Sequence, residues 1–445
     1  MMELRDPIHG AIEIQPYEIP IIDHPFVQRL RNIKQLGFSE LSFPGASHNR
    51  YNHSIGAVAV ATKAFASIFR RGMLPKVYYD RFLGAVRLAA LLHDVGHPPL
   101  SHATEFAMPP LCDLSIPCYR GVREGTGRAT HEDYTIKIIT DSSLSETLVG
   151  VIPGILPLHV AALIDIELPL EDDFFHFEGI DYRPLLSQIV SSELDVDRMD
   201  YLIRDSYFAG VHYGKFDLPW LISNLGCHIE SNRAYLALHQ RAIYAVDDFL
   251  IARYHMFLMI YFHHRAVVYE EMLKRFFEEG GDAYRLPTDI EVYAKVDDYH
   301  LYHHLRSSEN PWARRIIERR PFKVFMEVHG KRSDATGIDY DRITAILQEN
   351  GIVSILASSA GILSKYYARE DAPHAPPIYV FDESPILGKR VVQPLEEATD
   401  LFKKYREERQ ITRIYVDRDD LEKALALFRP SAVAQSVGLE GQQRG

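Results

Sequence analysis

Two imidazoles and two carboxylates in this chain, at His53, His93, Asp94 and Asp197, have the residue types of a metal site. Imidazole nitrogens and carboxylate oxygens suit Fe, Mn, Zn or Mg better than softer ions. A divalent metal held by such groups can make a nucleophile from water at neutral pH and can neutralise a phosphate. These residues are therefore candidates for a metal-dependent hydrolytic site.

The His93-Asp94 pair alone is weak evidence, because a lone buried histidine is more often a hydrogen-bonded core residue than a ligand. Its context favours a site, since residues 82–92 are almost all apolar and predict a buried helix. Polar groups at the end of such a helix need partners or a function. His97 would share a face with His93 if the helix continued as far as Pro98.

Two further helices are expected to position the other candidates. Residues 44–52 are rich in turn formers and lead into an apolar, periodic helix with His53 in its first turn. Asp197, Tyr201 and Asp205 are four residues apart and fall on one stripe of a second helix. That helix could instead be solvated and salt-bridged, as most charge runs are, but its apolar neighbours give it a buried side.

Longer strings around these residues resemble the HD-domain deoxynucleoside triphosphate triphosphohydrolases. The matching stretches are RDPIHG (5–10), DHPFVQRLRNIKQLG (23–37), PGASHNRYNHS (44–54), LHDVGH (92–97), THE (130–132) and DVDRMDY (195–201). The resemblance is dense from about residue 4 to 215, thinner to about 275 and patchy beyond. Such collinear strings are far more specific than the His-Asp dipeptide.

The resemblance implies a role for each matching position. The metal ligands would be His53, His93, Asp94 and Asp197, binding Fe, Mn, Mg or Zn, with a second Mg accompanying the triphosphate. The catalytic residues around the α-phosphate would be His97, His102, His131 and Glu105. Among these, His102 is the expected acid for the leaving 5′-oxygen, since histidine titrates near neutral pH.

Substrate contacts are also implied by the resemblance. The triphosphate would meet Arg50, Arg198, Tyr201 and Arg253; the sugar would meet Asp205, Gln35 and Leu36; and the base would meet Tyr261. Without the resemblance, the arginines could be ordinary ion pairs, Tyr261 a core residue, and Gln35 with Leu36 a helix end. His131 could simply pair with a neighbouring carboxylate.

Regulation is expected to differ from the vertebrate members, which assemble as tetramers when nucleotides fill interface sites. Asp23, Gln28 and Arg31 match guanine-nucleotide contacts of one such allosteric site. The second site looks altered, since the positions expected to be basic carry Trp220, Met259 and His264. We therefore expect a homo-oligomer, a tetramer or a dimer of dimers, with altered dependence on an activating nucleotide.

Helical periodicity dominates the chain, over residues 24–37, 53–70, 81–97, 131–140, 185–208 and 243–279. Strand-like stretches are few, at 11–14, 233–238, 324–328, 377–381 and 412–416. We predict a mainly α fold, with an HD-domain helical core over residues 1–300 and a smaller α+β lobe over 301–429. Residues 109–128 are expected to form a loop, and residues 430–445 a disordered tail.

Composition limits the other classes of function. A net charge of −12 argues against a nonspecific nucleic-acid coat, so an anionic substrate needs a local positive site. Three cysteines without metal spacing indicate a reducing cytoplasm. Prolines interrupt the longest apolar run, residues 148–164, which predicts two core helices with a break rather than a membrane span.

The expected function is hydrolysis of dNTPs to a deoxynucleoside and inorganic triphosphate. Two alternatives stay open: an HD-type phosphatase or phosphodiesterase acting on another nucleotide, and a regulator that binds nucleotide or nucleic acid. Retention of all four ligand positions argues against the regulator. The matches at Gln35, Leu36, Tyr201 and Asp205 favour a dNTP over another nucleotide.

Overall fold

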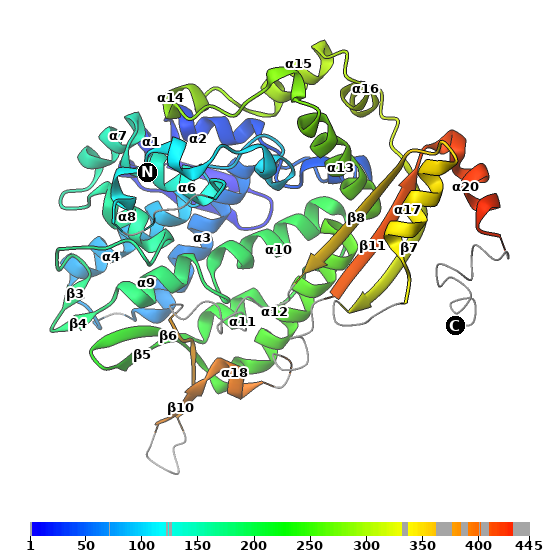
Figure 1. Ribbon diagram of the computed structural model, residues 1–445. Coiled ribbons are helices and arrows are strands. Elements are labelled where there is room, and N and C mark those ends of the chain that lie inside the picture. The colour runs from blue at the N-terminus through cyan, green and yellow to red at the C-terminus, as the bar shows by residue number, and fades with distance from the viewer. Residues whose placement is uncertain are drawn as a thin grey trace. The chain divides into compact units, whose positions relative to one another are not determined.

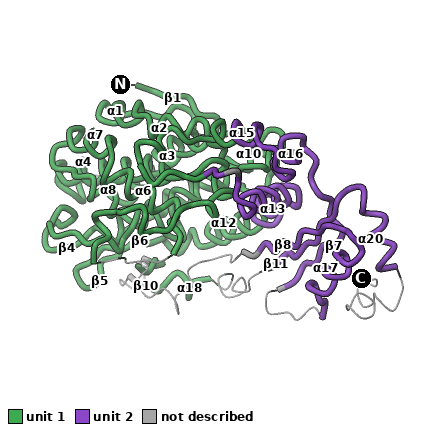
Figure 2. The backbone as a smooth tube through the Cα atoms, turned by 45° about the horizontal axis from the view of Figure 1, so that its top comes forward, with its two compact units in different colours: residues 1–256, 285–301, 364–403 green, residues 257–284, 302–363, 404–445 purple. Residues whose placement is uncertain are grey.

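A computed structural model describes residues 2–70, 72–121, 123, 127–331, 337–361, 376–383, 390–399, 401 and 409–429. Within these residues the protein is mainly α-helical, as predicted (Figure 1). The chain divides into two compact units (Figure 2). Unit 1 comprises residues 1–256, 285–301 and 364–403, and unit 2 comprises residues 257–284, 302–363 and 404–445. The predicted tail, residues 430–445, lies outside the described residues.

The helices that carry the candidate site all belong to unit 1. They are α3 (Arg50–Ile68), α4 (Lys76–Leu92), α6 (His131–Thr140) and α10 (Val196–Ala209), and α9 (Arg183–Val190) packs against α3, α4 and α10. Helix α3 packs against both α4 and α10 (Figure 1). Its interior is almost entirely small or apolar, and this composition allows neighbouring helices to approach closely.

Caps fix where these helices begin. The Asn49 side chain accepts a hydrogen bond from the Asn52 amide at the start of α3, and Thr130 with Asp133 forms a capping box at the start of α6. The Asp195 side chain caps α10 by accepting from the Arg198 amide at 2.8 Å. Helix α10 ends at Gly210, whose positive φ of 72° suits glycine.

Four predicted helices were too long. The stretch predicted over 24–37 forms only α2 (Pro25–Arg29) and a short 3-10 turn, Leu30–Asn32. The helix predicted over 81–97 ends at Leu92, and residues 93–96 form turns instead. The helix predicted over 185–208 is interrupted between α9 and α10, where Asp195 also accepts from the Ser192 amide at 2.9 Å. The helix predicted over 243–279 is divided by a π-helical turn, Phe257–Tyr261.

The remaining helices are short or lie away from the site. In unit 1 they are α1 (Ile19–Ile22), α2 (Pro25–Arg29), α5 (Leu111–Leu114), α7 (Ser143–Val151), α8 (Pro157–Ile164), α11 (Leu218–Ser223), α12 (Ile243–Met256), α14 (Ile290–Tyr293) and α18 (Leu395–Ala398). Helices α7 and α8 confirm the predicted break in the apolar run, whereas α5 lies within the predicted loop. No helix among the described residues is long and apolar enough to cross a membrane.

Unit 1 also contains a two-stranded hairpin and a mixed sheet. The hairpin pairs β1 (Met2–Asp6) with β2 (Gly10–Ile14), in a register that sets Asp6 opposite Gly10. The mixed sheet has the order β10-β9-β6-β4-β3, with β5 also paired to β6. Its strands are β3 (His176–Phe177), β4 (Ile180–Asp181), β5 (Leu225–Glu230), β6 (Arg233–His239), β9 (Tyr379–Glu383) and β10 (Arg390–Pro394).

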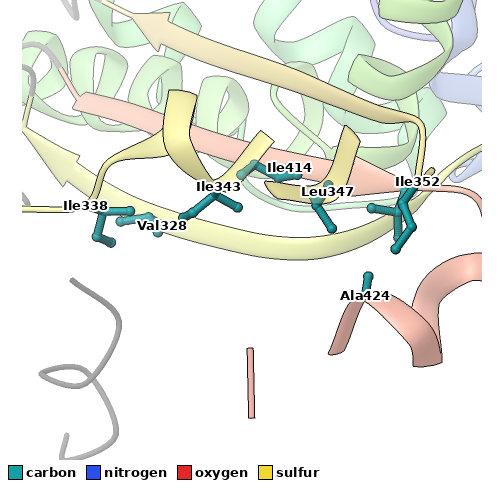
Figure 3. Packing of buried hydrophobic residues seen from close by; sticks show 8 residues of the cluster. Val328, Ile338, Ile343, Leu347, Ile352, Ile414 and Ala424 are labelled. Carbon is teal, nitrogen blue, oxygen red and sulfur yellow. The ribbon is translucent and has the colours of Figure 1, made fainter. Parts of the chain in front are cut away.

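Unit 2 combines helices with a three-stranded antiparallel sheet in the order β7-β11-β8. These strands are β7 (Lys323–Lys331), β8 (Ser354–Gly361) and β11 (Arg409–Val416). The helices include α13 (His264–Glu278), α16 (Pro311–Ile317), α17 (Tyr340–Glu349), α20 (Leu421–Leu427) and residues 302–307 of α15 (Asp298–Ser307), whose first turn belongs to unit 1. Apolar side chains of α17, including Ile343 and Leu347, pack on Ile414 and Val328 of the sheet (Figure 3). All five predicted strand stretches are confirmed.

Candidate metal and phosphohydrolase site

Four side chains from three helical segments converge within unit 1. His53 comes from the first turn of α3, His93 and Asp94 follow the last turn of α4, and Asp197 comes from the first turn of α10. His53 Nε2 lies 3.2 Å from His93 Nε2 and 3.0 Å from Asp197 Oδ1. Asp94 oxygens lie 3.5 Å from each of these two imidazole nitrogens.

Both imidazoles are oriented through their other ring nitrogen. His53 Nδ1 donates to Asp200 Oδ2 at 2.8 Å, and His93 Nδ1 donates to the Ala90 carbonyl at 2.8 Å. With the Nδ1 proton engaged in these bonds, each Nε2, which faces the two carboxylates, is the atom that would bind a metal in place of a proton. Two imidazole nitrogens and two carboxylates with outer hydrogen bonds of this kind fit a divalent metal.

The charge around the cluster also favours a cation. Burial alone would lower the pKa of His53, but hydrogen bonds to the Asp197 and Asp200 carboxylates raise it to about 10. Burial alone would raise the pKa of Asp94, but the Arg50 guanidinium and the imidazoles hold it well below its usual range. The carboxylates thus stay ionised and stabilise positive charge at the imidazole nitrogens, as a metal requires.

A second cluster, formed by His97, His102, Glu105 and His131, lies next to the first. His131 Nδ1 and His102 Nδ1 both contact Glu105 Oε1, the latter at 3.1 Å. The ring centroids of His97 and His131 are 3.9 Å apart. The two imidazoles beside it hold the pKa of Glu105 well below its usual range, against the effect of burial. Glu105 therefore carries a negative charge between two imidazoles.

The two clusters share Asp94. Its Oδ1 lies 3.3 Å from His97 Nδ1 as well as 3.5 Å from His93 Nε2. His97 is only 1% exposed, and its Nε2 has no hydrogen-bond partner among the described residues. A buried nitrogen without a partner costs free energy in the free protein and is a natural contact for a ligand.

Three arginines predicted to contact triphosphate are held by carboxylates. Arg50 Nη1 donates to Asp94 Oδ2 at 2.6 Å, and its Nε donates to Ser101 Oγ at 2.9 Å. Arg198 contacts Asp195, and Arg253 Nη1 lies 3.1 Å from Glu193 Oε2. Each pair is buried or nearly so, and the sequence did not indicate these partners.

The residues predicted to contact the sugar lie near His48, for which no role was predicted. His48 Nε2 bonds to Asp205 Oδ1 at 2.8 Å, and the His48 carbonyl accepts from the Gln35 amide at 3.0 Å. Gln35 and Asp205 are both buried, while Leu36 is half-buried. Gln35 Oε1 has no hydrogen-bond partner in the described part of the chain.

Two predicted substrate contacts remain, one beside the ligand cluster and one in unit 2. Tyr201 stands one turn after Asp197 on α10, with its ring 6.5 Å from that of His53. Tyr261 belongs to unit 2, at the end of the π-helical turn, and its place beside the base stays a prediction.

The three residues of the predicted nucleotide-regulatory site lie close to one another in unit 1. Arg31 Nε donates to Gln28 Oε1 at 2.8 Å, and the Arg31 guanidinium lies 3.6 Å from the centre of the Tyr51 ring. Burial raises the pKa of Tyr51, and the nearby carboxylate of Asp23, at the end of α1, raises it further. Their role in binding a nucleotide stays a prediction.

Residues 293–298, far along the chain, support the turn that carries His97. Arg29 Nη2 donates to the His97 carbonyl at 2.7 Å, while its Nε donates to the Val296 carbonyl at 2.6 Å. The Tyr293 hydroxyl donates to the Gly96 carbonyl at 2.8 Å. Sequence reasoning missed these contacts, because an arginine and a tyrosine in separate short helices show no common pattern.

Comparison with known families agrees with this geometry. Residues 50–205 match the HD domain, and residues 216–420 match the HD associated region. The first match begins at Arg50 and ends at Asp205, so it contains all four ligand positions. The chain therefore carries an HD domain, which is typical of metal-dependent phosphohydrolases, followed by the HD associated region.

Individual relatives are similar over much of the chain. An uncharacterized protein of Methanocaldococcus jannaschii is 31% identical over 323 residues, covering 73% of this chain and 59% of that protein. The uncharacterized protein YwfO of Bacillus subtilis is 27% identical, and the match covers 85% of this chain and 84% of YwfO. The human deoxynucleoside triphosphate triphosphohydrolase SAMHD1 is 28% identical, and the match covers 67% of this chain but only 50% of SAMHD1.

Two solved structures share the fold. A hypothetical protein from Aquifex aeolicus superposes with a TM-score of 0.70 at 26% identity, covering 96% of this chain and 100% of that chain. A phosphohydrolase from Bacteroides thetaiotaomicron superposes with a TM-score of 0.67 at 23% identity, covering 94% of this chain and 100% of its own. The second likeness concerns the fold alone.

Proposed function

We propose that the protein hydrolyses dNTPs to a deoxynucleoside and inorganic triphosphate. The observation that carries the proposal is that the ligand cluster and the histidine cluster share Asp94, with the Arg50 guanidinium 2.6 Å from the same carboxylate. A phosphate beside Asp94 would meet a metal site, a guanidinium and imidazoles together. The similarity to SAMHD1 proteins, which are named as deoxynucleoside triphosphate triphosphohydrolases, supports the choice of substrate.

In this proposal the arginines bind the phosphates of the substrate. A divalent metal held by His53, His93, Asp94 and Asp197 would supply an acidified water and neutralise part of the phosphate charge. Arg50, Arg198 and Arg253 would bind phosphate oxygens, since a planar guanidinium matches them well. The carboxylates that hold these arginines in the free protein keep them in place until substrate arrives.

In this proposal the second cluster, which contains His102, His131 and Glu105, transfers the proton. The leaving 5′-oxygen needs a proton, and we assign its donation to His102, whose side chain is 65% exposed and accessible to substrate. Because His102 Nδ1 contacts Glu105, its Nε2 is the nitrogen available to the leaving oxygen. The ionised Glu105 would stabilise the protonated imidazole, and His131 shares the same carboxylate oxygen.

Product analysis tests this proposal. Purified protein with Mn²⁺ or Mg²⁺ would be incubated with each dNTP and NTP, and the products would be separated by ion-exchange chromatography. We expect nucleoside and inorganic triphosphate. Nucleoside monophosphate with pyrophosphate, or nucleoside diphosphate with orthophosphate, would indicate an HD enzyme of another specificity. Metal-loaded protein that turns over no nucleotide would favour a binding function.

We expect a preference for deoxynucleotides over ribonucleotides. Gln35 and Leu36 would pack on the sugar and leave no room for a 2′-hydroxyl, while Asp205 would accept from the 3′-hydroxyl. Polar groups left unpaired cost about 1–3 kcal/mol each, so kcat/KM for dATP should exceed that for ATP by roughly 10- to 100-fold. Gln35→Ala should narrow this ratio in competition assays. Equal rates on dATP and ATP in the wild type would contradict the expectation.

Self-assembly completes the proposal. We expect a homo-oligomer whose response to nucleotides differs from that of vertebrate relatives, because Trp220 and Met259 replace basic contacts with exposed apolar side chains. Ligand-driven assembly requires tighter nucleotide binding to the oligomer than to the monomer. Light scattering with and without GTP and dNTPs, alongside activity on single dNTPs, is the test. A monomer fully active on every dNTP alone would refute the oligomer, and strong GTP-dependent tetramerisation would refute altered regulation.

A further inference from the structure

A buried carboxylate, Asp200, lies directly behind the proposed metal ligand His53. Asp200 is 0% exposed and accepts hydrogen bonds from three side chains. Its Oδ2 accepts from His53 Nδ1 and from Arg204 Nε, both at 2.8 Å. Its Oδ1 accepts from His9 Nε2 at 2.6 Å and from Arg204 Nη2 at 3.0 Å. Four donors therefore fix both oxygens of this carboxylate.

The N-terminal hairpin completes this network. Arg204 Nη1 donates to Asp6 Oδ2 at 2.8 Å, and Asp6 Oδ1 accepts from the amides of Ile8 and His9 at 2.9 and 2.8 Å. The turn between β1 and β2 is thereby fastened to helix α10. This turn places His9 in contact with Asp200, which lies 191 residues later in the sequence.

The backbone of α3 makes room for the network at Gly56. A Cβ atom at this position would lie 2.1 Å from Asp200 Oδ1 and 2.2 Å from Arg204 Nη2. Both atoms belong to buried side chains that are hydrogen-bonded to each other and to further residues, so neither can move without losing partners. Gly56 is one turn after His53, and its missing side chain lets the carboxylate reach the His53 ring.

We propose that Asp200, held by His9 and Arg204, is a positioning residue of the metal site, and that the N-terminal turn is a functional part of that site. An ionised carboxylate on Nδ1 keeps the proton there, so that Nε2 presents its lone pair to the metal. It also makes the imidazole a stronger donor, as outer-shell carboxylates do at other metal sites. The inference rests on the metal site of the proposed function and does not depend on the nucleotide.

A purely structural role is the competing explanation, because a buried ion pair also fastens the hairpin to α10. The chain offers a matched control in Glu18 and Arg87, another buried bidentate pair. Arg87 Nε donates to Glu18 Oε1 at 2.6 Å, and its Nη2 donates to Glu18 Oε2 at 2.7 Å. Breaking either pair leaves a buried arginine poorly compensated and should destabilise the fold. Only the Asp200 pair touches a metal ligand.

Mn²⁺ affinity is the decisive measurement, by competition with a chromophoric chelator on the full chain. We expect Asp200→Asn to weaken Mn²⁺ binding about 10- to 100-fold. Glu18→Gln should lower the melting temperature of the metal-free protein yet bind Mn²⁺ like the wild type. The absorption spectrum of the Co²⁺-loaded protein should change with Asp200→Asn and not with Glu18→Gln, because only the former alters the His53 donor.

If Asp200→Asn does not fold, variants of His9 test the same inference with a smaller change. His9→Leu removes one donor to Asp200 and should weaken Mn²⁺ binding several-fold, whereas His9→Gln, which keeps an N–H donor, should restore part of it. Mn²⁺ affinity within twofold of the wild type in the folded Asp200 and His9 variants would overturn the inference, as would an equal loss in Glu18→Gln. A wild-type protein that binds no divalent metal would instead refute the proposed function.

Discussion

Replacement of His93 by alanine is expected to remove bound metal and to lower dNTP hydrolysis at least about 1,000-fold. The His93 ring is fixed by its bond to Ala90, and its Nε2 lies 3.2 Å from that of His53. No other imidazole on these helices can take its place without moving the backbone. Loss of a metal that supplies several kcal/mol of transition-state stabilisation corresponds to such a factor, since each 1.36 kcal/mol is tenfold. Elemental analysis and steady-state assays would measure both effects.

A buried histidine outside the site is the control for this experiment. His159 is buried, and its Nε2 bonds to Asp172 Oδ2 at 2.8 Å, so it also forms a histidine–aspartate pair. His159→Ala should cost stability but leave metal content and turnover near those of the wild type. Full metal content and normal turnover in His93→Ala would contradict the metal-site assignment.

Replacement of His102 by alanine is expected to reduce kcat by roughly 100- to 10,000-fold, the usual contribution of a general acid. The 65% exposed side chain makes few packing contacts, so the variant should keep its fold and its metal. Glu105→Gln should have a smaller effect in the same direction, because the amide cannot stabilise a protonated imidazole as a carboxylate does. Rapid-mixing assays with saturating dATP would measure the chemical step.

The leaving group distinguishes proton donation from substrate binding. A triphosphate ester of 4-nitrophenol needs no proton on its departing oxygen, since nitrophenolate is a stable anion. His102→Ala should therefore lose much less activity on this ester than on dATP. An equal loss on both substrates would assign His102 to binding and not to proton transfer.

The sequence indicated which helices carry the proposed ligands, because each ligand position lies in or beside a stretch with a recognisable apolar pattern. Asn49 and Asp195 cap the helices that carry His53 and Asp197. The turn-rich stretch before His53 indicated the first helix start, whereas the start at Asp195 was not predicted, because residues 185–208 were expected to form one helix. The apolar stretch before His93 likewise predicted a buried helix. Local signals thus sufficed to place His53 and Asp197 on helices, whereas His93 and Asp94 lie just beyond the end of theirs.

The end of α4 could not be predicted from such signals. The helix stops at Leu92 and not near Pro98, so His93 and His97 do not share a helical face. The reason is tertiary: a Cβ atom at Gly96 would lie 2.3 Å from the His131 carbonyl, because the turn packs against the start of α6. The turn also frees His93 to bond back to Ala90.

The outer network was missed for a related reason. Asp200 and Arg204 are four residues apart on a predicted helix, a spacing that usually indicates a surface ion pair. Only the folded chain brings His9 and Asp6 to them from the N-terminal hairpin. Contacts between residues so far apart in sequence have no periodic signature.

Hydrolysis of dATP in water enriched in ¹⁸O tests the central claim most directly. If the metal-dependent site cleaves at the α-phosphorus, the oxygen of water enters the triphosphate, and mass spectrometry should find one ¹⁸O in inorganic triphosphate and none in deoxyadenosine. The reaction should stop when the metal is removed with a chelator and resume when it is restored. Label in deoxyadenosine, or in orthophosphate released with a nucleoside diphosphate, would contradict the account.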